Sequence, residues 1–379
     1  MLYRRWMLAA AVLAQVLVAS QVEAQVGRQV RSDLTAAGPT SVRIYATGLD
    51  RPWGIAFLPD GRLLVTEKPG RLRVVDKEGK VSDPIPGLPE IYVEGQGGLL
   101  DVAVHPRFNE NQFVYFSYVK AGPDNTSATA LGRGRFVNDR IENFQELFVH
   151  EPWVPRGLHY GSRIVFNDKN QIFLTIGDRF QFQPAQDLNN HLGKVIRLND
   201  DGSVPKDNPF VGRDGAKPEI WSLGHRNMQA AAIDPATGDL WVVEMGPLGG
   251  DELNKVEAGK NYGWPVVSWG INYDGTPIPN PDTRPEFTDA VRVWTPVISP
   301  SGMTFYTGDV FPEWKGSAFI GGLSSQALIR VKIENGRVVE EERIPLQTRI
   351  RDVQQGPDGY LYLIPDGPNS AIWQMRPLK

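Results

Sequence analysis

The sequence predicts an all-β protein, a six-bladed β-propeller built from one repeated unit. The first observation is the abundance of turn formers, with 39 glycines and 30 prolines in 379 residues. The second is that the apolar runs are short, rich in β-branched or aromatic residues, and bounded by turn residues, which is typical of strands rather than helices. The third is an internal repeat, which decides the architecture.

The repeat consists of an apolar strand, a turn at Asp-Gly or its equivalent, a second apolar strand, and an exit rich in Gly or Asp. Its six copies begin at Trp53, Gly98, Gly161, Gln229, Gly302 and Arg351. One such hairpin cannot bury both of its faces, so we expect six sheets packed around a common axis. The segment SVRIYATGL, residues 41–49, precedes the first copy and is expected to close the ring as the outer strand of the last blade.

The spacing between copies is widest from the third to the fifth. The two long loops there, residues 199–220 and 268–294, are expected to lie on the surface and to shape a binding face. Two stacked β-sandwich domains are the competing architecture, but no low-complexity linker separates two halves of the chain. We therefore expect residues 41–379 to form one propeller domain, preceded by a partly flexible segment, residues 25–40.

The first 24 residues resemble an export signal. Arg4 and Arg5 precede an apolar stretch from Trp6 to Ser20, and small or apolar residues lead to a cleavage point after Ala24. The stretch is shorter than the roughly 20 residues that span a bilayer, and no later segment approaches that length. We expect a periplasmic or secreted protein without a membrane span, exported by the general route or by the twin-arginine route that the paired arginines also suggest.

Charge and cysteine content exclude some classes of function. The formal net charge is −4 and becomes −5 without residues 1–24, which carry two Arg and one Glu, so the sequence offers no basis for binding nucleic acid. The chain has no cysteine, although export usually permits disulfides. Stability is therefore expected to come from packing or from a bound ion.

His159 is the strongest candidate for acid-base chemistry among the five histidines. It lies just before the third repeat, and Asp178 lies 19 residues later, at the end of the following strand. An antiparallel hairpin returns its second strand to the level where the first began, so the two side chains can meet. A carboxylate on one imidazole nitrogen makes the other a general base. The alternative is a histidine bonded to a loop carbonyl, the structural role expected for His105, His150 and His191.

Two further segments carry polar groups beside strand ends. Arg226 and Asn227, in LGHRN, can hold a polar or anionic ring system, or they only cap the blade. In EMGPLGGDELN, a turn at Gly246 and Pro247 exposes backbone carbonyls, the hard oxygen donors that Ca²⁺ accepts, and Glu252 follows in the same loop. A glycine-rich loop with acidic side chains and no ion is the alternative.

A pair of arginines precedes the last repeat. Arg349 and Arg351 are two residues apart on a predicted strand, so their side chains share one face. Two guanidinium groups on one face repel unless an anion or a carboxylate lies between them. The pair therefore indicates an anion-binding site, although an exposed pair costs little in water.

Taken together, these phrases resemble a known family, the pyrroloquinoline quinone (PQQ)-dependent soluble aldose sugar dehydrogenases, related to soluble glucose dehydrogenase. The resemblance covers nearly the whole chain after residue 24. The phrases that carry it, in order, are GQGGLLDVAVHP, HYGSRIVF…IGDR, RLNDDGSVPKDNPF, LGHRN, EMGPLGGDELN…GKNYGWP and RIRDV…GPDGYLYL.

The resemblance implies a six-bladed propeller with the quinone over its channel, so the elaborated loops are expected to lie on the cofactor face. It assigns His159 the role of general base, with Asp178 as its carboxylate partner. His159 is then expected to take the proton of the sugar's C1 hydroxyl while the C1 hydride passes to the quinone, giving a lactone. Arg226 matches the arginine that binds the quinone carbonyl where negative charge develops.

The resemblance also implies the remaining contacts to the cofactor and to Ca²⁺. Asn227 and Gln96 match quinone contacts, and Arg349 and Arg351 match arginines that neutralise the cofactor's carboxylates. The carbonyls of Gly246 and Pro247 match ligands of the catalytic Ca²⁺, and Glu252 with the backbone of Tyr262 matches a second Ca²⁺ site. The family passes electrons to a separate acceptor, a quinone or a cytochrome.

Three positions depart from the family pattern. Ser324 stands where a cofactor-contacting lysine is expected, Met245 replaces a polar residue, and Leu158 replaces a polar neighbour of the base. The short loops near Leu158 predict an open site that accepts many mono- and disaccharides. Two rival functions stay open: a Ca²⁺-dependent hydrolase or lactonase on the same propeller, and a non-catalytic propeller that binds sugar or protein.

Overall fold

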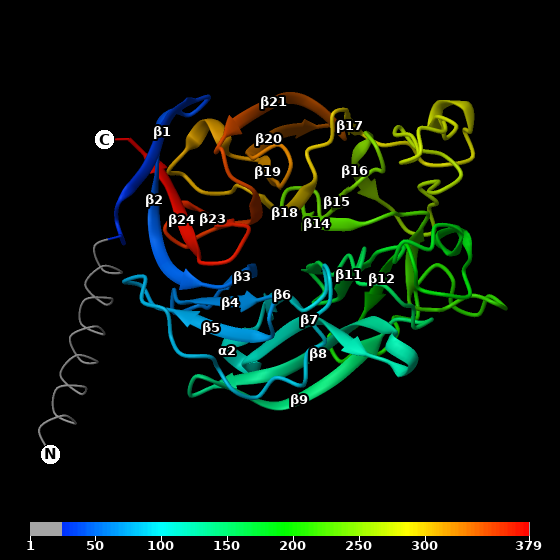
Figure 1. The fold of residues 1–379 in the computed structure, drawn as a ribbon, viewed down its shortest axis with the longest axis horizontal. Coiled ribbons are helices and arrows are strands. Elements are labelled where there is room, and N and C mark those ends of the chain that lie inside the picture. The colour runs from blue at the N-terminus through cyan, green and yellow to red at the C-terminus, as the bar shows by residue number, and fades with distance from the viewer. Residues whose placement is uncertain (1–24, 379) are drawn as a thin grey trace, which may run out of the picture.

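Six β-sheets are arranged radially around a central axis in the computed structural model, which describes residues 25–378 (Figure 1). Each of the six predicted repeats forms one sheet. The innermost strands contact one another in a closed ring, from the first blade through the sixth and back to the first. The predicted β-propeller is confirmed, and the sandwich alternative is wrong. The predicted export signal, residues 1–24, lies outside the described residues.

The blades follow one another along the chain, and each is listed here with its strands from the axis outward. Blade 1 contains β3 (Pro52–Phe57), β4 (Leu63–Glu67) and β5 (Arg71–Val75). Blade 2 contains β6 (Leu99–Val104), β7 (Phe113–Ala121), β8 (Ser127–Val137) and β9 (Arg140–Val149). Blade 3 contains β10 (Ile164–Phe166), β11 (Ile172–Ile176), β12 (Lys194–Leu198) and β13 (Ile220–Leu223).

The second half of the ring is built in the same way. Blade 4 contains β14 (Met228–Ile233), β15 (Leu240–Glu244), β16 (Asp251–Val256) and β17 (Arg292–Trp294). Blade 5 contains β18 (Pro300–Phe305), β19 (Ser317–Gly322), β20 (Ala327–Glu334) and β21 (Arg337–Pro345). Blade 6 contains β22 (Ile350–Gln355), β23 (Leu361–Pro365) and β24 (Ser370–Pro377), followed outward by β2 (Gly38–Leu49) and β1 (Gln29–Thr35).

The two ends of the described chain meet in blade 6, which closes the ring. Strand β2 pairs antiparallel with β24, so the N-terminal segment supplies the outer strand that the sequence predicted. Strand β1 then pairs with β2 as a fifth strand. The first strands of the chain, drawn in blue, accordingly lie beside the red C-terminal strands in Figure 1. Pairing of the two chain ends within one sheet links the first blade to the last, so the ring cannot open without breaking these strand–strand hydrogen bonds.

The core lies between the blades rather than in one central cluster. Six large apolar clusters are each formed by the facing surfaces of two adjacent sheets. Between blades 3 and 4, for example, Val195 packs with Val242, and both are fully buried. Each blade therefore depends on both of its neighbours to bury its faces, which explains why six similar hairpins form one domain.

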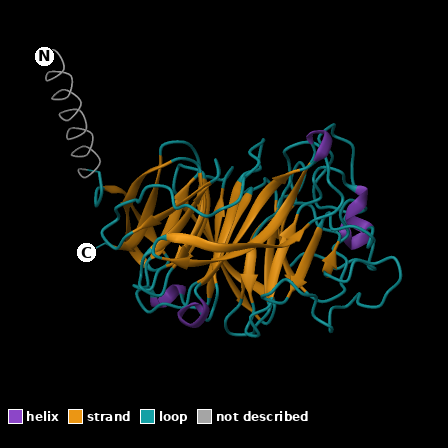
Figure 2. Ribbon diagram, turned by 90° about the horizontal axis from the view of Figure 1, so that it is seen from below, coloured by secondary structure: helices purple, strands orange, loops and turns teal. Residues whose placement is uncertain are grey.

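Helical structure is scarce among the described residues. It consists of one helical turn, α2 (Phe108–Asn111), and four short 3₁₀ segments at the periphery of the sheets (Figure 2). These segments are η1 (Pro123–Asn125), η2 (Gln183–Gln186), η3 (Pro281–Thr283) and η4 (Pro312–Trp314). Within residues 25–378 we find no helix with the length and apolar character needed to traverse a bilayer.

The two long loops start from opposite ends of the propeller relative to the His159–Asp178 pair. Residue Leu198, where the first loop begins, pairs with Ile172 at the far end of β11 from Asp178. The expectation that residues 199–220 shape the same face as His159 is therefore wrong. The second loop does approach that end of the propeller, since Tyr273 reaches the Arg226 guanidinium.

Candidate active site

His159 and Asp178 meet at one end of blade 3, as the hairpin geometry predicted. Nδ1 of His159 lies 2.7 Å from Oδ1 of Asp178, and both residues are buried. The second carboxylate oxygen accepts a hydrogen bond of 2.8 Å from the indole N–H of Trp264. An ionised carboxylate only accepts hydrogen bonds, so it holds the proton on Nδ1 and leaves Nε2 as an acceptor.

The imidazole of His159 is suited to act as a base at neutral pH. Burial lowers its pKa, the negative charge of Asp178 opposes this effect, and the nearby Arg226 and Arg179 lower the pKa further. The net result is a pKa below the ordinary value of 6.5, which favours the neutral ring. A neutral ring with one free nitrogen can accept a proton from a substrate hydroxyl.

Arg179 holds the backbone on which His159 stands. Its guanidinium donates to the carbonyl oxygens of Leu158 and Arg156, and it lies over the ring of Tyr160 at 3.7 Å from the ring centroid. His159 itself has a left-handed backbone, with φ of 48°. Such a conformation is unfavourable for a residue with a side chain, so it needs support from surrounding contacts. The buried Arg179 provides part of that support.

Arg226 lies beside this pair, at the start of blade 4. Its Nη1 donates to the carbonyl oxygens of Met245 (2.9 Å) and Gly246 (2.8 Å), and its Nη2 donates to the hydroxyl of Tyr273 (3.0 Å). The side-chain oxygen of Asn227 accepts a bond from Gly161 N–H, on the loop that follows His159. The structure thus brings the predicted Arg226, Asn227 and Gly246 next to the His159 loop.

A cavity of about 370 Å³ opens at this end of the central channel. Gln96 lies on its wall and accepts a hydrogen bond from the backbone N–H of His159, which connects the cavity to the His159–Asp178 pair. Arg349 and Arg351 also line it, as predicted for an anion site. The remaining lining residues are Arg51, Pro52, Trp53, Lys68, Gly95, Gln229, Met245, Ser299, Leu323, Asp366 and Gly367.

The cavity is strongly basic. Arg349 and Arg351 share the carboxylate of Asp366, at 2.9 and 3.0 Å, so a protein carboxylate already lies between the two guanidinium groups. The sequence left an anion or a carboxylate open at that place, and the resemblance assigned it to the cofactor, so Asp366 was missed. The wall nevertheless carries four cationic side chains, including Arg51 and Lys68, against this one carboxylate, a formal excess of three positive charges. Such a surface favours an anionic ligand.

The turn after β15 carries the groups predicted to hold an ion. The Gly246 carbonyl faces Arg226, and the Gly246 N–H donates to Asp251 at 2.8 Å, which fixes the turn. A second, smaller cavity of about 10 Å³ lies alongside and is lined by Glu244, Glu252 and Tyr262, among others. Burial and the charge of Glu244 raise the pKa of Glu252 well above its usual range.

These two carboxylates on adjacent strands fit a bound cation. Glu244 and Glu252 are cross-strand partners of β15 and β16, so like charges would face each other if both were ionised. A cation between them would relieve that repulsion, and the cavity has room for about one ion. Within residues 25–378 no cluster of three or more His, Cys, Asp or Glu side chains surrounds a common point, so backbone carbonyls would complete the ligand set.

The comparison with known proteins identifies the family. The sequence pattern of the family described as Glucose / Sorbosone dehydrogenase matches residues 49–374 of the chain. The chain belongs to the glucose/sorbosone dehydrogenase family. It is accordingly an oxidoreductase that acts on sugars, a class that the His159–Asp178 pair and the adjoining cavity suit.

Individual members of the glucose/sorbosone dehydrogenase family match the whole propeller. The aldose sugar dehydrogenase YliI of Escherichia coli is 40% identical over 356 residues, covering 91% of this chain and 95% of its own. The crystal structure of the E. coli soluble aldose sugar dehydrogenase in its apo-form superposes with a TM-score of 0.86 at 39% identity, covering 89% of this chain and 100% of that one. The PQQ-bound aldose sugar dehydrogenase of Streptomyces coelicolor gives 0.73 at 25% identity, covering 91% and 99%.

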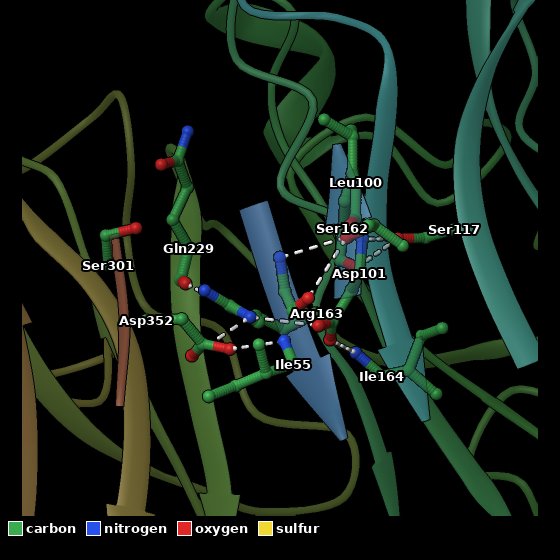
Figure 3. A network of polar contacts seen from close by, with 12 residues as sticks. Ile55, Leu100, Asp101, Ser117, Ser162, Arg163, Ile164, Gln229, Ser301 and Asp352 are labelled. Atoms are coloured by element: carbon green, nitrogen blue, oxygen red, sulfur yellow. Dashed lines mark hydrogen bonds and ion pairs between the residues drawn. The ribbon is translucent and has the colours of Figure 1, made fainter. Parts of the chain in front are cut away.

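In this family member, a buried ion-pair network joins blades 2, 3 and 6. Figure 3 shows Arg163 between Asp101 and Asp352, with its Nη1 at 2.9 and 3.3 Å from their Oδ1 atoms. Arg163 also donates to the backbone carbonyl oxygens of Gln229 (2.7 Å) and Arg351 (3.1 Å), two residues of the cavity wall. The network therefore fixes cavity-lining backbone from blades 4 and 6.

The two carboxylates of that network are buried, and the charge of Arg163 only partly offsets the effect of burial on their pKa values. Burial raises the pKa of Asp352 to about 6, and the charge of Asp101 acts in the same direction. Burial also raises the pKa of Asp101, while the shared Arg163 guanidinium opposes both shifts. On its other side Arg163 lies over the ring of Trp53, 4.2 Å from the centroid. Arg163 thus also supports the aromatic wall of the cavity.

Sequence reasoning missed several residues that build the site. Trp264, Asp366, Arg163 and Lys68 reach it from different blades, and none stands at a diagnostic spacing from His159. The three histidines expected to be structural line neither cavity described above. One of them, His150, is completely buried, with no hydrogen-bond partner for its ring nitrogens among the described residues.

Proposed function

We propose that this chain is a PQQ- and Ca²⁺-dependent aldose dehydrogenase that oxidises the C1 hydroxyl of aldoses to lactones. One observation carries the proposal: a basic cavity suited to an anionic, planar cofactor adjoins a buried His159–Asp178 pair with a free imidazole nitrogen. Family membership limits the substrate to sugars, and the PQQ-bound relative supports the choice of cofactor.

The cavity residues fit PQQ, a planar quinone with several carboxylates. Arg349, Arg351 and the other basic side chains match the carboxylates, and the ring of Trp53 offers a flat apolar wall. Gln96, with its amide N–H₂ group, supplies a hydrogen-bond donor next to the His159 backbone. When bound, the quinone would supply the acceptor for the hydride that leaves C1 of the sugar.

His159 would remove the hydroxyl proton at C1 through Nε2 while the C1 hydride departs. Asp178 would keep the imidazole oriented and stabilise the positive charge that the ring gains with the proton. Arg226, which is buried and adjoins the His159 loop, would stabilise negative charge that develops next to it during hydride transfer. The hydroxyl proton thus has an acceptor in the protein, His159.

Two groups of residues would hold Ca²⁺. The carbonyls of Gly246 and Pro247 would bind the catalytic ion, and Glu252 with the backbone of Tyr262 would bind the second, where Glu244 adds negative charge. An ion bound at the Gly246 turn would supply a Lewis acid next to the quinone. In this structure the Gly246 carbonyl oxygen accepts a hydrogen bond from Arg226 at 2.8 Å, so the catalytic ion would use the second lone pair of that oxygen or replace this bond.

Cell location, substrate range and electron acceptor extend the proposal. An export signal in residues 1–24 would place the enzyme in the periplasm or outside the cell. The electrons would pass to a separate quinone or cytochrome. The open loops near Leu158 favour a broad range of mono- and disaccharides, and a strict preference for one sugar would contradict that part.

The test is reconstitution. The purified protein is stripped of metal, mixed with Ca²⁺ and PQQ, and assayed with an artificial electron acceptor and a panel of aldoses, with and without a chelator. Sugar-dependent dye reduction that requires both additions is the expected result. Binding of PQQ without turnover on any aldose would contradict the substrate class, and hydrolysis of a lactone without PQQ would favour the hydrolase instead.

A further inference from the structure

Lys68 places an ammonium group in the basic cavity from blade 1. It follows directly after β4, and its side chain lines the cavity with Arg51 and Arg351. Its Nζ donates a hydrogen bond of 2.5 Å to the carbonyl oxygen of Gly95, the residue before Gln96. Lys68 therefore lies next to the cavity residue that is hydrogen-bonded to the His159 backbone.

The backbone of Lys68 is held firmly, so the position of its side chain is part of the fold. Its N–H donates to the Arg51 carbonyl oxygen at 2.9 Å, and its own carbonyl oxygen accepts from Leu99 N–H at 3.1 Å. Gly98 packs so closely on the Lys68 carbonyl that a side chain at Gly98 would clash with it. These contacts join the β4–β5 turn to the Gly95–Leu99 loop at the rim of the cavity.

The surroundings of the Lys68 ammonium group are positive. Burial lowers its pKa, and the charges of Arg351 and Arg51 lower it further, while the carboxylate of Asp366 acts in the opposite direction. That carboxylate is already hydrogen-bonded to Arg349 and Arg351. Among the described residues, the one hydrogen bond of the ammonium group goes to a neutral carbonyl. Lys68 is half-buried, so an anion in the cavity would form a stronger, charge-assisted hydrogen bond with it than this carbonyl does.

Ser324, which stands where a cofactor-binding lysine was expected, does not line the cavity. Ser324 is exposed, and its hydroxyl donates to the Val297 carbonyl oxygen at 3.1 Å. The neighbouring Leu323 lines the cavity instead. Blade 5, which carries Ser324, and blade 1, which carries Lys68, flank blade 6 on opposite sides. Both can approach a ligand bound to the arginines of blade 6.

We propose that Lys68 binds a carboxylate of the quinone cofactor, so that blade 1 supplies the ammonium group that is absent at Ser324. This assignment rests on the function proposed above. Lys68 acts together with Arg349 and Arg351, and the ligand then meets cations from two adjacent blades. The excess of positive charge in the cavity is thereby balanced on binding.

The test measures PQQ binding directly, independently of turnover. The Ca²⁺-loaded protein and its Lys68→Met variant are titrated with PQQ, using the quenching of tryptophan fluorescence, because Trp53 lines the cavity. Loss of one charge-assisted hydrogen bond should raise the Kd about 10- to 100-fold. The salt dependence of binding should also become shallower. Lys77→Met is the matched control, because Lys77 is an exposed lysine at the opposite end of the same blade and lies outside the cavity wall.

A second measurement uses the unsubstituted protein and needs no variant to fold. Acetylation of lysines by a small reagent is followed by mass spectrometry with and without saturating PQQ. Lys68 should be protected by PQQ, whereas Lys77 should react equally in both samples. Equal Kd values for Lys68→Met and the original chain, or unchanged acetylation of Lys68, would overturn this assignment and leave the proposed function standing. Failure of the original chain to bind PQQ would overturn both.

Discussion

Replacing Asp178 by Asn tests whether the carboxylate makes His159 a base. Asp178 is completely buried, so the change alters neither the surface nor the wall of the basic cavity. Its oxygens accept hydrogen bonds from His159 (2.7 Å), Trp264 (2.8 Å) and the Phe180 N–H (2.8 Å). An amide keeps the shape and one acceptor but loses the negative charge that stabilises a protonated imidazole.

The expected fall in kcat follows from the loss of this negative charge. General-base catalysis contributes about 10²- to 10⁴-fold in rate, and the base depends on Asp178 for both orientation and charge. We expect kcat of Asp178→Asn to fall by about that factor, equivalent to about 2.7 to 5.5 kcal/mol. Because Asp178 raises the pKa of His159, its removal should also move the acid limb of the pH–rate profile to lower pH. The Kd for PQQ should change little.

The assay is steady-state dye reduction by the reconstituted variant between pH 4.5 and 8.5, with PQQ affinity measured separately. A thermal melt of the variant shows whether it is folded. If Asp178→Asn keeps kcat within about threefold of the original, the carboxylate does not act through His159 and the reasoning is wrong. A fall in kcat with the acid limb moved to higher pH would contradict the electrostatic part of it.

Three further perturbations follow from single contacts. Tyr273→Phe removes the hydroxyl that is hydrogen-bonded to Arg226 at 3.0 Å. Tyr273 is exposed, so water can replace the hydroxyl, and kcat/KM should fall only about two- to tenfold. A larger loss would show that Tyr273 has another role. Glu252→Gln should remove the part of the Ca²⁺-induced stabilisation that comes from the second site, about 2.7 kcal/mol of unfolding free energy at a Ca²⁺ concentration 100-fold above its Kd, and leave the Tm in chelator unchanged or higher. A Ca²⁺ response equal to the original would exclude Glu252 as a ligand. His150, whose pKa burial lowers well below its usual value, destabilises the fold as pH falls below its unfolded pKa of about 6.5, by up to about 1.4 kcal/mol per pH unit. His150→Leu should flatten that dependence in denaturant unfolding at pH 5 and 7, and an equal pH dependence would contradict this account.

The sequence predicted what is local in the fold. Each blade begins with a hairpin of consecutive strands, so the copies could be counted from Trp53 to Arg351 without knowledge of how they pack. His159 and Asp178 were paired correctly for the same reason, since one hairpin joins them. The closing strand β2 was predicted because a ring of sheets needs a partner for its last edge.

Contacts between blades could not be predicted in this way. Trp264 reaches Asp178 across 86 residues, and Asp366 joins Arg349 and Arg351 from beyond the next strand. Lys68 was missed because a single lysine after a strand carries no signal in the sequence. The loop from residue 199 was placed at the wrong end because loop length does not indicate which end of a blade a loop leaves. Strand β1 was missed because its residues alternate weakly between exposed and partly buried positions.

The most direct test of the central claim is a single turnover in the absence of any electron acceptor. The PQQ- and Ca²⁺-loaded protein is mixed rapidly with an aldose, and the absorbance of the oxidised quinone is followed for the original chain and for His159→Ala. We predict stoichiometric reduction by the original chain, and PQQ binding by His159→Ala with an affinity within about threefold but reduction about 10²- to 10⁴-fold slower. Equal rates of reduction in the two proteins would contradict the assignment of His159 as the base.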